Sequence, residues 1–182
     1  MCKVPVIDIG NDEAVFSQAP VRRLVYIVLL LATKDRATEV RFEPSDTDSE
    51  WKLRYEVGGR WYDMVPVPLN IPISQEIRHM ARLRFASAWQ RLCAWHTDKS
   101  APDASALRLV ISGKGIEITA SFHRWGSGSR ALEAVVLRLP PTTVLAEQAG
   151  SILGDYCRKH LHEVEQTGGP ANQSAAADRP RE

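Results

Sequence analysis

The chain has 182 residues, of which 44% are hydrophobic and 25% are charged, as in ordinary soluble domains. Its 23 basic and 22 acidic residues nearly cancel, so the overall charge excludes a charge-based argument for a nucleic-acid or membrane-surface binder. Three widely spaced cysteines, Cys2, Cys93 and Cys157, argue against a disulfide framework and favour a reducing compartment. The first residues show no secretory signal. We therefore expect a cytoplasmic protein.

The N-terminal part of the chain is predicted to form a flexible lead-in segment followed by a buried helix. Residues 1–17 are expected to be flexible, with at most one added strand over Val4 to Ile9. A helix is predicted from Pro20 to about Asp35, because proline suits the first helical turn. Its apolar run, Leu24 to Ala32, is far shorter than the roughly 20 residues that span a bilayer, so no membrane-spanning segment is expected.

Alternating polar and apolar residues then predict three strands, over 38–43, 51–57 and 60–65. Gly58-Gly59 is a two-residue hairpin signal between the second and third strands. Prolines at positions 66, 68 and 72 predict an extended connection after the hairpin.

In the second half of the chain, the sequence predicts a second group of strands with a helix before it and a helix after it. Ser74 is a suitable N-cap for a helix to about Arg84, and a second short helix is an option around 89–95. Three strands are predicted over 107–112, 116–123 and 132–139. A last helix is predicted from Thr142 or Thr143 to about Val164.

These elements predict an α+β fold, a two-layer sandwich of about six antiparallel strands with helices mainly on one face. The domain should cover residues 18–165. Residues 166–182 have no aliphatic side chain larger than alanine and are expected to form a disordered tail. The side chains expected to be largely buried are Leu29, Val40, Phe42, Leu53, Tyr55 and Val136.

A family resemblance begins at Ala19, where the chain reads A-P-V-R-R-L-V-Y-I-V-L-L-L-A-T-K-D-R-A-T-E-V-R-F-E-P up to Pro44. This string resembles the opening of the N-terminal domain of type II secretion and type IV pilus assembly ATPases. The family pattern is close to A-P-V-V-x-L-V-N-x-I-L-x-x-A-[IV]-x-x-x-A-S-D-I-H-I-E-P. The matching residues are Ala19, Pro20, Val21, Leu24, Val25, Leu29, Ala32, Ala37, Glu43 and Pro44.

Three later segments extend the resemblance to about residue 140. Residues 53–59 are similar to the family's V-R-Y-R-[IV]-D-G, residues 73–83 to its I-S-R-I-K-I-M-A-x-L, and residues 135–139 to its V-V-L-R-L. The resemblance implies a PAS-like domain and, as a partner, a protein such as a secretion or pilus ATPase.

The departures from the family concern its catalytic features. No segment of the chain reads G-x-x-x-x-G-K-[ST], the phosphate-binding P-loop, so no ATPase activity is expected. In the family, this domain lends arginines to the bound nucleotide. At the matching positions Arg54 is retained as a remnant, whereas Glu56 and Thr119 replace two arginines. A glutamate beside a triphosphate would repel it.

The sequence also contains residues suited to a zinc site and to a protein interface. Cys93 with His96 and Cys157 with His160 have the ligand types of a zinc site, but the pairs are far apart in sequence, and we expect no metal or other cofactor. Trp125 follows a strand at a glycine-rich loop, where exposure would favour an interface, and Arg41 is a second interface candidate.

The sequence thus predicts a non-catalytic protein-interaction or regulatory module that docks on a full-length ATPase. One alternative is an independent PAS-like sensor that binds a small ligand. Another is an enzyme fragment that requires a separately encoded ATPase core, which Glu56 and Thr119 disfavour.

Overall fold

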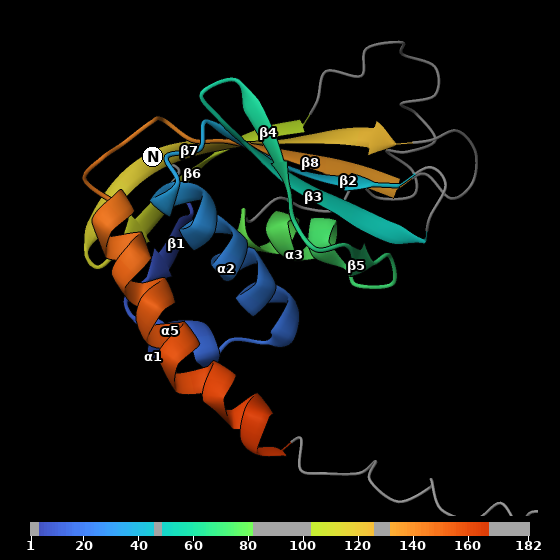
Figure 1. The fold of residues 1–182 in the computed structure, drawn as a ribbon. Coiled ribbons are helices and arrows are strands. Elements are labelled where there is room, and N and C mark those ends of the chain that lie inside the picture. Colours follow the sequence, from blue (N-terminus) through green and yellow to red (C-terminus); the bar gives the residue numbers. More distant parts are fainter. Residues whose placement is uncertain (1–3, 46–48, 82–102, 126–131, 168–182) are drawn as a thin grey trace, which may run out of the picture.

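The computed structural model describes residues 4–45, 49–81, 103–125 and 132–167 (Figure 1). In this part of the chain, eight strands form one open sheet, and four helices gather on one of its faces (Figure 1). The chain is therefore α+β. No helix in these four ranges has the length and hydrophobicity needed to cross a membrane.

The helices are α1 (Asp12–Phe16), α2 (Pro20–Lys34), α3 (Ile73–Met80) and α5 (Ala146–Thr167). The strands are β1 (Val6–Ile9), β2 (Glu39–Pro44), β3 (Glu50–Val57), β4 (Arg60–Asp63), β5 (Val67–Pro68), β6 (Asp103–Ile111), β7 (Lys114–Trp125) and β8 (Leu132–Arg138). Their order across the sheet is β1-β6-β7-β8-β2-β3-β4, and β5 also pairs with β3.

The sheet is larger than the sequence predicted, and it is mixed. We expected about six antiparallel strands, but β1 runs parallel to β6, with Val6 opposite Arg108. Local patterning could not show this pairing, because its partners are about a hundred positions apart. The two-residue β5 was also missed because it contains Pro68, and proline fits a sheet only at an edge.

The N-terminal segment contributes to the fold through β1 and α1. The side chains of Ile7 and Ile9 are 2% and 0% exposed, and Asn11 caps α1 by accepting a hydrogen bond from the Ala14 amide at 2.8 Å. Lys159 on α5 donates a hydrogen bond to Asp12 at 2.6 Å, which lowers the pKa of Asp12 and raises the pKa of Lys159. The first and last helices are therefore tied together.

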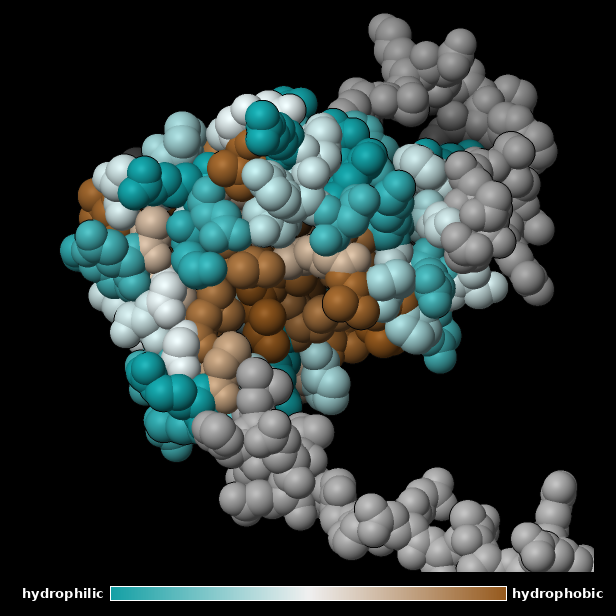
Figure 2. Space-filling view, in the orientation of Figure 1, coloured by the Kyte–Doolittle hydropathy of each residue, from teal (hydrophilic) through white to brown (hydrophobic). Residues whose placement is uncertain are grey.

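Helix α2 forms where the proline-led apolar run predicted it. Pro20 occupies its first turn, and Val25, Leu29 and Leu30 are fully buried against the sheet and neighbouring helices. Leu24, Ile27 and Leu31 lie on its other side and are only partly buried. Figure 2 shows apolar surface gathered in the hollow centre of this view, over α2 and toward β5.

Period-two alternation gives the central strands one buried face. Val40 and Phe42 on β2 are fully buried, as is Leu53 on β3. Glu39 and Arg41 point to the opposite face, which no helix in the described ranges covers. Val136 also lies on this opposite face, directly across from Arg41, and is only half-buried. The expectation that Val136 is largely buried was wrong, because Val135 and Leu137 take the inner positions of β8.

Several helix and strand boundaries differ between the sequence prediction and the structure. Helix α3 begins at Ile73, so Ser74 lies inside the helix rather than capping it. Strand β7 continues to Trp125 because its pairing with β8 extends to Leu132. The last helix continues to Thr167, so the first two residues of the tail predicted over 166–182 are helical. The rest of that tail and the optional helix around 89–95 lie outside the described residues.

One hydrogen bond joins the C-terminal end of α2 to the sheet. The hydroxyl of Tyr55 on β3 donates to Oδ2 of Asp35 at 2.7 Å. Burial, followed by this hydrogen bond, raises the pKa of Tyr55 to about 12.

Replacing Leu29 by alanine should lower the free energy of unfolding by about 2–5 kcal/mol, because a fully buried leucine leaves a cavity. Chemical denaturation monitored by circular dichroism measures this loss. Leu31→Ala is the matched control on the partly buried side of α2 and should cost less. Equal losses for the two variants would contradict the packing described here.

Tyr55→Phe should cost about 1 kcal/mol, because it removes the hydrogen bond to Asp35. The raised pKa means that the unfolded chain loses the tyrosine proton first as pH increases. The wild-type advantage should therefore hold below the ordinary tyrosine pKa of about 10 and decline as pH rises from there toward 12. Denaturation of both proteins across this range measures the difference, and a gap that widened with pH would contradict the assignment.

Candidate functional site

The sheet face that no helix in the described ranges covers, here called the helix-free face, carries a continuous group of charged and aromatic side chains on four neighbouring strands. We call this group the outer face. It consists of Glu39, Arg41, Glu43, Lys52, Arg54, Glu56, Trp61, Asp63 and Arg138. Period-two alternation places these side chains here, because their sequence neighbours fill the inner face.

The strand register brings like charges directly opposite each other. Arg41 on β2 lies opposite Arg54 on β3, and Glu39 lies opposite Glu56. Such pairs are destabilising unless neighbouring groups compensate them. The strands can therefore pair in this register only if other residues balance the charges.

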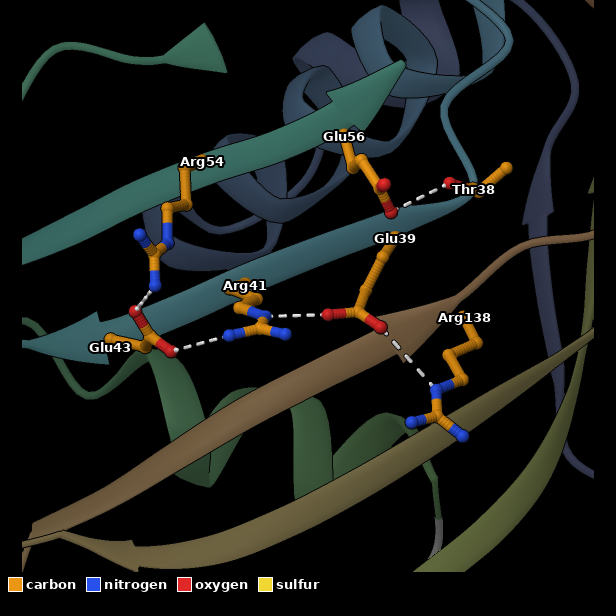
Figure 3. A network of polar contacts seen from close by, with 7 residues as sticks. All are labelled: Thr38, Glu39, Arg41, Glu43, Arg54, Glu56 and Arg138. Atoms are coloured by element: carbon orange, nitrogen blue, oxygen red, sulfur yellow. Dashed lines mark hydrogen bonds and ion pairs between the residues drawn. The ribbon is translucent and has the colours of Figure 1, made fainter. Parts of the chain in front are cut away.

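Ion pairs along β2 and between β2 and β3 provide that balance (Figure 3). A carboxylate oxygen of Glu43 accepts a hydrogen bond from Nη2 of Arg54 at 2.6 Å, and its other oxygen lies 3.5 Å from Nη1 of Arg41. Glu39 accepts a hydrogen bond from Nε of Arg41 at 2.5 Å. Two glutamates on β2 thus separate and hold the two opposed arginines.

The same network continues to its neighbours. The second oxygen of Glu39 accepts from Nε of Arg138 on β8 at 3.4 Å. Glu56 accepts a hydrogen bond from the Thr38 hydroxyl at 3.0 Å. Each of the three glutamates therefore has a partner in the network (Figure 3).

Trp61 on β4 completes the cluster with an aromatic surface. The guanidinium carbon of Arg41 lies 4.6 Å from the centre of the Trp61 ring, and that of Arg54 lies 4.9 Å from it. Each such cation–π contact contributes about 0.5–1 kcal/mol at an exposed site. The Trp61 side chain is held in place by two arginines and is still 39% exposed.

The environment keeps Arg41 charged and leaves Arg54 one unused donor. Burial lowers the pKa of Arg41, but the hydrogen bond and charge of Glu39, together with Glu43, outweigh it and raise that pKa above its ordinary value. The Nε of Arg54 is buried and has no hydrogen-bond partner within the described ranges. The cluster therefore offers positive groups that are already positioned on an aromatic ring.

The structure brings together several positions singled out from the sequence. Arg54 and Arg41 are direct cross-strand neighbours, and Glu56 lies on the same face. Thr119 on β7 is exposed opposite Arg138, which itself lies opposite Glu39. The three positions where the resembled family carries nucleotide-assisting arginines thus share the helix-free face.

Trp125 differs from its expected setting. It is the last residue of β7 and is half-buried, rather than exposed in a glycine-rich loop. The extended pairing with Leu132 accounts for this difference.

The cysteine–histidine pairs are only partly described. Cys157 is an exposed free thiol on α5. The ring of His160 stacks on Phe16 with centroids 4.0 Å apart, which places it in the junction between α1 and α5. Cys93 and His96 lie outside the described residues, and within those residues no three His, Cys, Asp or Glu side chains gather as metal ligands.

Sequence reasoning missed Trp61, Glu39 and Glu43 as members of one cluster. The signal for Trp61 was present, because the two-residue Gly58-Gly59 turn fixes the register that puts Trp61 opposite Glu56. The register between β2 and β3 had no such local signal, since the loop that joins these strands is longer.

Glu43→Gln should lower the free energy of unfolding by about 1.5–3 kcal/mol, because Glu43 accepts charge-assisted hydrogen bonds between two opposed arginines. Thermal and chemical denaturation at low salt measure this loss. Arg138→Gln is the control, since the Arg138 side chain is 72% exposed and its removal should change stability by less than about 1 kcal/mol. Similar losses in both variants would show that Glu43 does not compensate the arginine pair.

Comparison with known proteins identifies two relatives. The chain is 31% identical over 136 residues to the type II secretion system protein HxcR of Pseudomonas aeruginosa, which covers 74% of this chain and 24% of that protein. It is 30% identical over 134 residues to the type II secretion system protein E of Xanthomonas campestris pv. campestris, which covers 72% of this chain and 21% of that protein. No protein-family model matches the chain.

These matches confirm the resemblance that begins at Ala19. The matched region is about a quarter or less of each relative's length. The chain is therefore similar to type II secretion system proteins E and HxcR over about three quarters of its own length, and it spans only about a quarter or less of theirs.

Proposed function

We propose that this chain is a non-catalytic protein-interaction module that docks on a full-length secretion ATPase through its outer face. The observation that carries this proposal is the cluster of Arg41, Trp61 and Arg54 on a sheet face that no described helix covers. We also propose that the domain is PAS-like and works in the cytoplasm, as the resemblance and the cysteine content imply.

The composition of the cluster fits a protein partner. Tryptophan and arginine are enriched among the residues that dominate binding energy at protein interfaces. The ion pairs in Figure 3 hold both arginines in place before a partner arrives, which reduces the entropy lost on binding. An apolar group of the partner on the exposed face of the Trp61 ring would complement this surface.

The same surface is poorly suited to a nucleotide. The network contains Arg41, Arg54 and Arg138 against three glutamates, so its formal charges cancel. Arg54 is bound to Glu43, and Glu56 stands where the family carries an arginine. A triphosphate would have to displace one carboxylate and approach another, and both steps are electrostatically unfavourable.

The choice of an ATPase as partner depends on the two relatives. Type II secretion proteins E and HxcR contain a region similar to this chain, and that region makes up about a quarter or less of their length. In such a protein, the similar region contacts the rest of the polypeptide. A separate chain with a related scaffold can compete for those contacts or add to them. The assignment is an analogy at the level of the fold, and the changed residues at positions 56 and 119 give it a non-catalytic character.

The small-ligand sensor receives less support. The pocket lined by Thr33, Arg36, Leu139 and neighbouring residues has almost no room even for a water molecule. Drug-sized ligands occupy pockets of roughly 300–1,000 Å³. This pocket therefore does not provide the enclosed volume that a sensor of such ligands requires.

Trp61→Ala should weaken binding to the full-length type II secretion protein E of the source organism by about 30-fold, the effect of losing a buried aromatic anchor worth about 2 kcal/mol. Titration calorimetry with the purified proteins measures the affinity. Phe16→Ala, which removes an exposed aromatic ring from the helix layer, is the control and should bind like wild type. Unchanged binding by Trp61→Ala, or no complex with wild type, would refute the proposal.

Thr119→Arg restores the arginine of the family pattern and should still give no ATP turnover. The sequence contains no P-loop to hold the phosphates, and one arginine cannot replace it. Phosphate release by the isolated variant measures turnover, with wild type as the baseline. Turnover above that baseline would show that the chain has a phosphate-binding site of its own.

A further inference from the structure

We propose that strand β4 joins two copies of this chain into a symmetric dimer through antiparallel edge-to-edge pairing. Strand β4 is the last strand in the sheet order, and among the residues that the structure describes it pairs only with β3 (Figure 1). Its other edge faces away from the sheet. This inference does not rest on the proposed docking function, although both surfaces include Trp61.

The hairpin register shows which backbone groups of β4 are unused. The two-residue turn makes Val57 and Arg60 a hydrogen-bonded pair, and the Met64 amide donates to the Leu53 carbonyl at 2.8 Å. Hydrogen-bonded pairs alternate along an antiparallel ladder, so Tyr62 also bonds to β3. The amides and carbonyls of Trp61 and Asp63 therefore point to the free edge.

A two-fold axis at Tyr62 pairs these groups with each other. Trp61 of one copy then lies opposite Asp63 of the second copy, and both backbone bonds form at each of the two positions. Four hydrogen bonds join the copies, and every outward group of β4 has a partner. The axis is perpendicular to the sheet, so both helix layers lie on the same side.

Other symmetric registers are less favourable. An axis at Trp61 would place Asp63 opposite Gly59, which lies in the hairpin turn with φ of +81°. An axis at Asp63 would place two aspartates directly opposite each other, which is destabilising. The register at Tyr62 has no like charges opposite, because Arg60 lies across from Met64 of the second copy.

The side chains along this edge also favour self-association. Trp61, Tyr62 and Val65 are 39%, 45% and 82% exposed, an unusual concentration of large apolar groups within five positions. Natural edge strands are commonly protected by short length, charged side chains, proline or a bulge; β4 is short and carries Arg60 and Asp63, but it has no lysine, proline or bulge.

Tyr62 would lie at the centre of the interface. It stacks on Tyr55 within its own chain, with ring centroids 5.5 Å apart. The dimer would place the two Tyr62 rings side by side on the inner face and would extend this aromatic stack across the axis. Because only a short strand contributes, the interface is small, and the dimer should be weak and dependent on concentration.

Asp63→Pro tests the pairing with little effect on the fold. The Asp63 amide makes no bond within the hairpin, so proline removes only two of the four intermolecular bonds, and proline is tolerated at such edge positions. Sedimentation equilibrium over a concentration series should show a wild-type dimer whose dissociation constant rises about tenfold or more in this variant.

Two controls isolate the edge of β4. Asp63→Ala keeps the amide and should keep the dimer. Asp8→Pro makes the matched change on β1, the other free edge, where the parallel ladder leaves the Asp8 amide outward, and it should also keep the dimer. A wild-type monomer at every concentration, or equal weakening by Asp63→Pro and Asp8→Pro, would overturn the proposal.

Disulfide trapping tests the register. In a background with Cys2, Cys93 and Cys157 changed to serine, Tyr62→Cys should form an intermolecular disulfide, because facing residues in a non-hydrogen-bonded pair have Cα atoms about 4.5 Å apart. Arg60→Cys should not, since the two copies of position 60 lie at opposite ends of the pairing. Cross-linking of both variants alike, or of neither, would contradict this dimer.

Discussion

One-sided burial of the sheet is the constraint on which the rest of the structure depends. In the described part of the chain, helices pack on one face only, so each central strand must alternate between apolar residues such as Val40 and Phe42 and polar residues such as Glu39 and Arg41. A single slip in register would exchange the two sets. The charged outer face is therefore a direct consequence of how the core is built, and its chemistry is available for binding.

Charge compensation on that face limits the residues that can occupy it. The register sets Arg41 against Arg54 and Glu39 against Glu56, and ion pairs of Arg41 with Glu39 and of Arg54 with Glu43 compensate these like charges. Trp61 adds a ring on which both arginines lie. The relatives matched by this chain are secretion proteins, and the resemblance implies arginines at positions 56 and 119. Glutamate and threonine stand at these positions in this chain, and the charges of the network in Figure 3 balance.

The sequence was informative where the pattern is local. Proline followed by an apolar run located α2, and the paired glycines located the hairpin of β3 and β4. The pairing of β1 with β6, the two-residue β5 and the half-buried positions of Val136 and Trp125 depend on contacts between distant segments, so local periodicity could not predict them. Within the candidate site, Arg54 and Arg41 were identified, but their contact through Trp61 and Glu43 required the register between strands.

The most direct test of the central claim is an NMR titration of the labelled chain with the full-length type II secretion protein E of its source organism. The account predicts that the indole signal of Trp61 and the guanidinium signals of Arg41 and Arg54 shift or broaden first. Signals of α1 and α5 should change least, since these helices lie on the other side of the sheet (Figure 1). Changes confined to the helix layer, or no change at all, would contradict a docking role for the outer face.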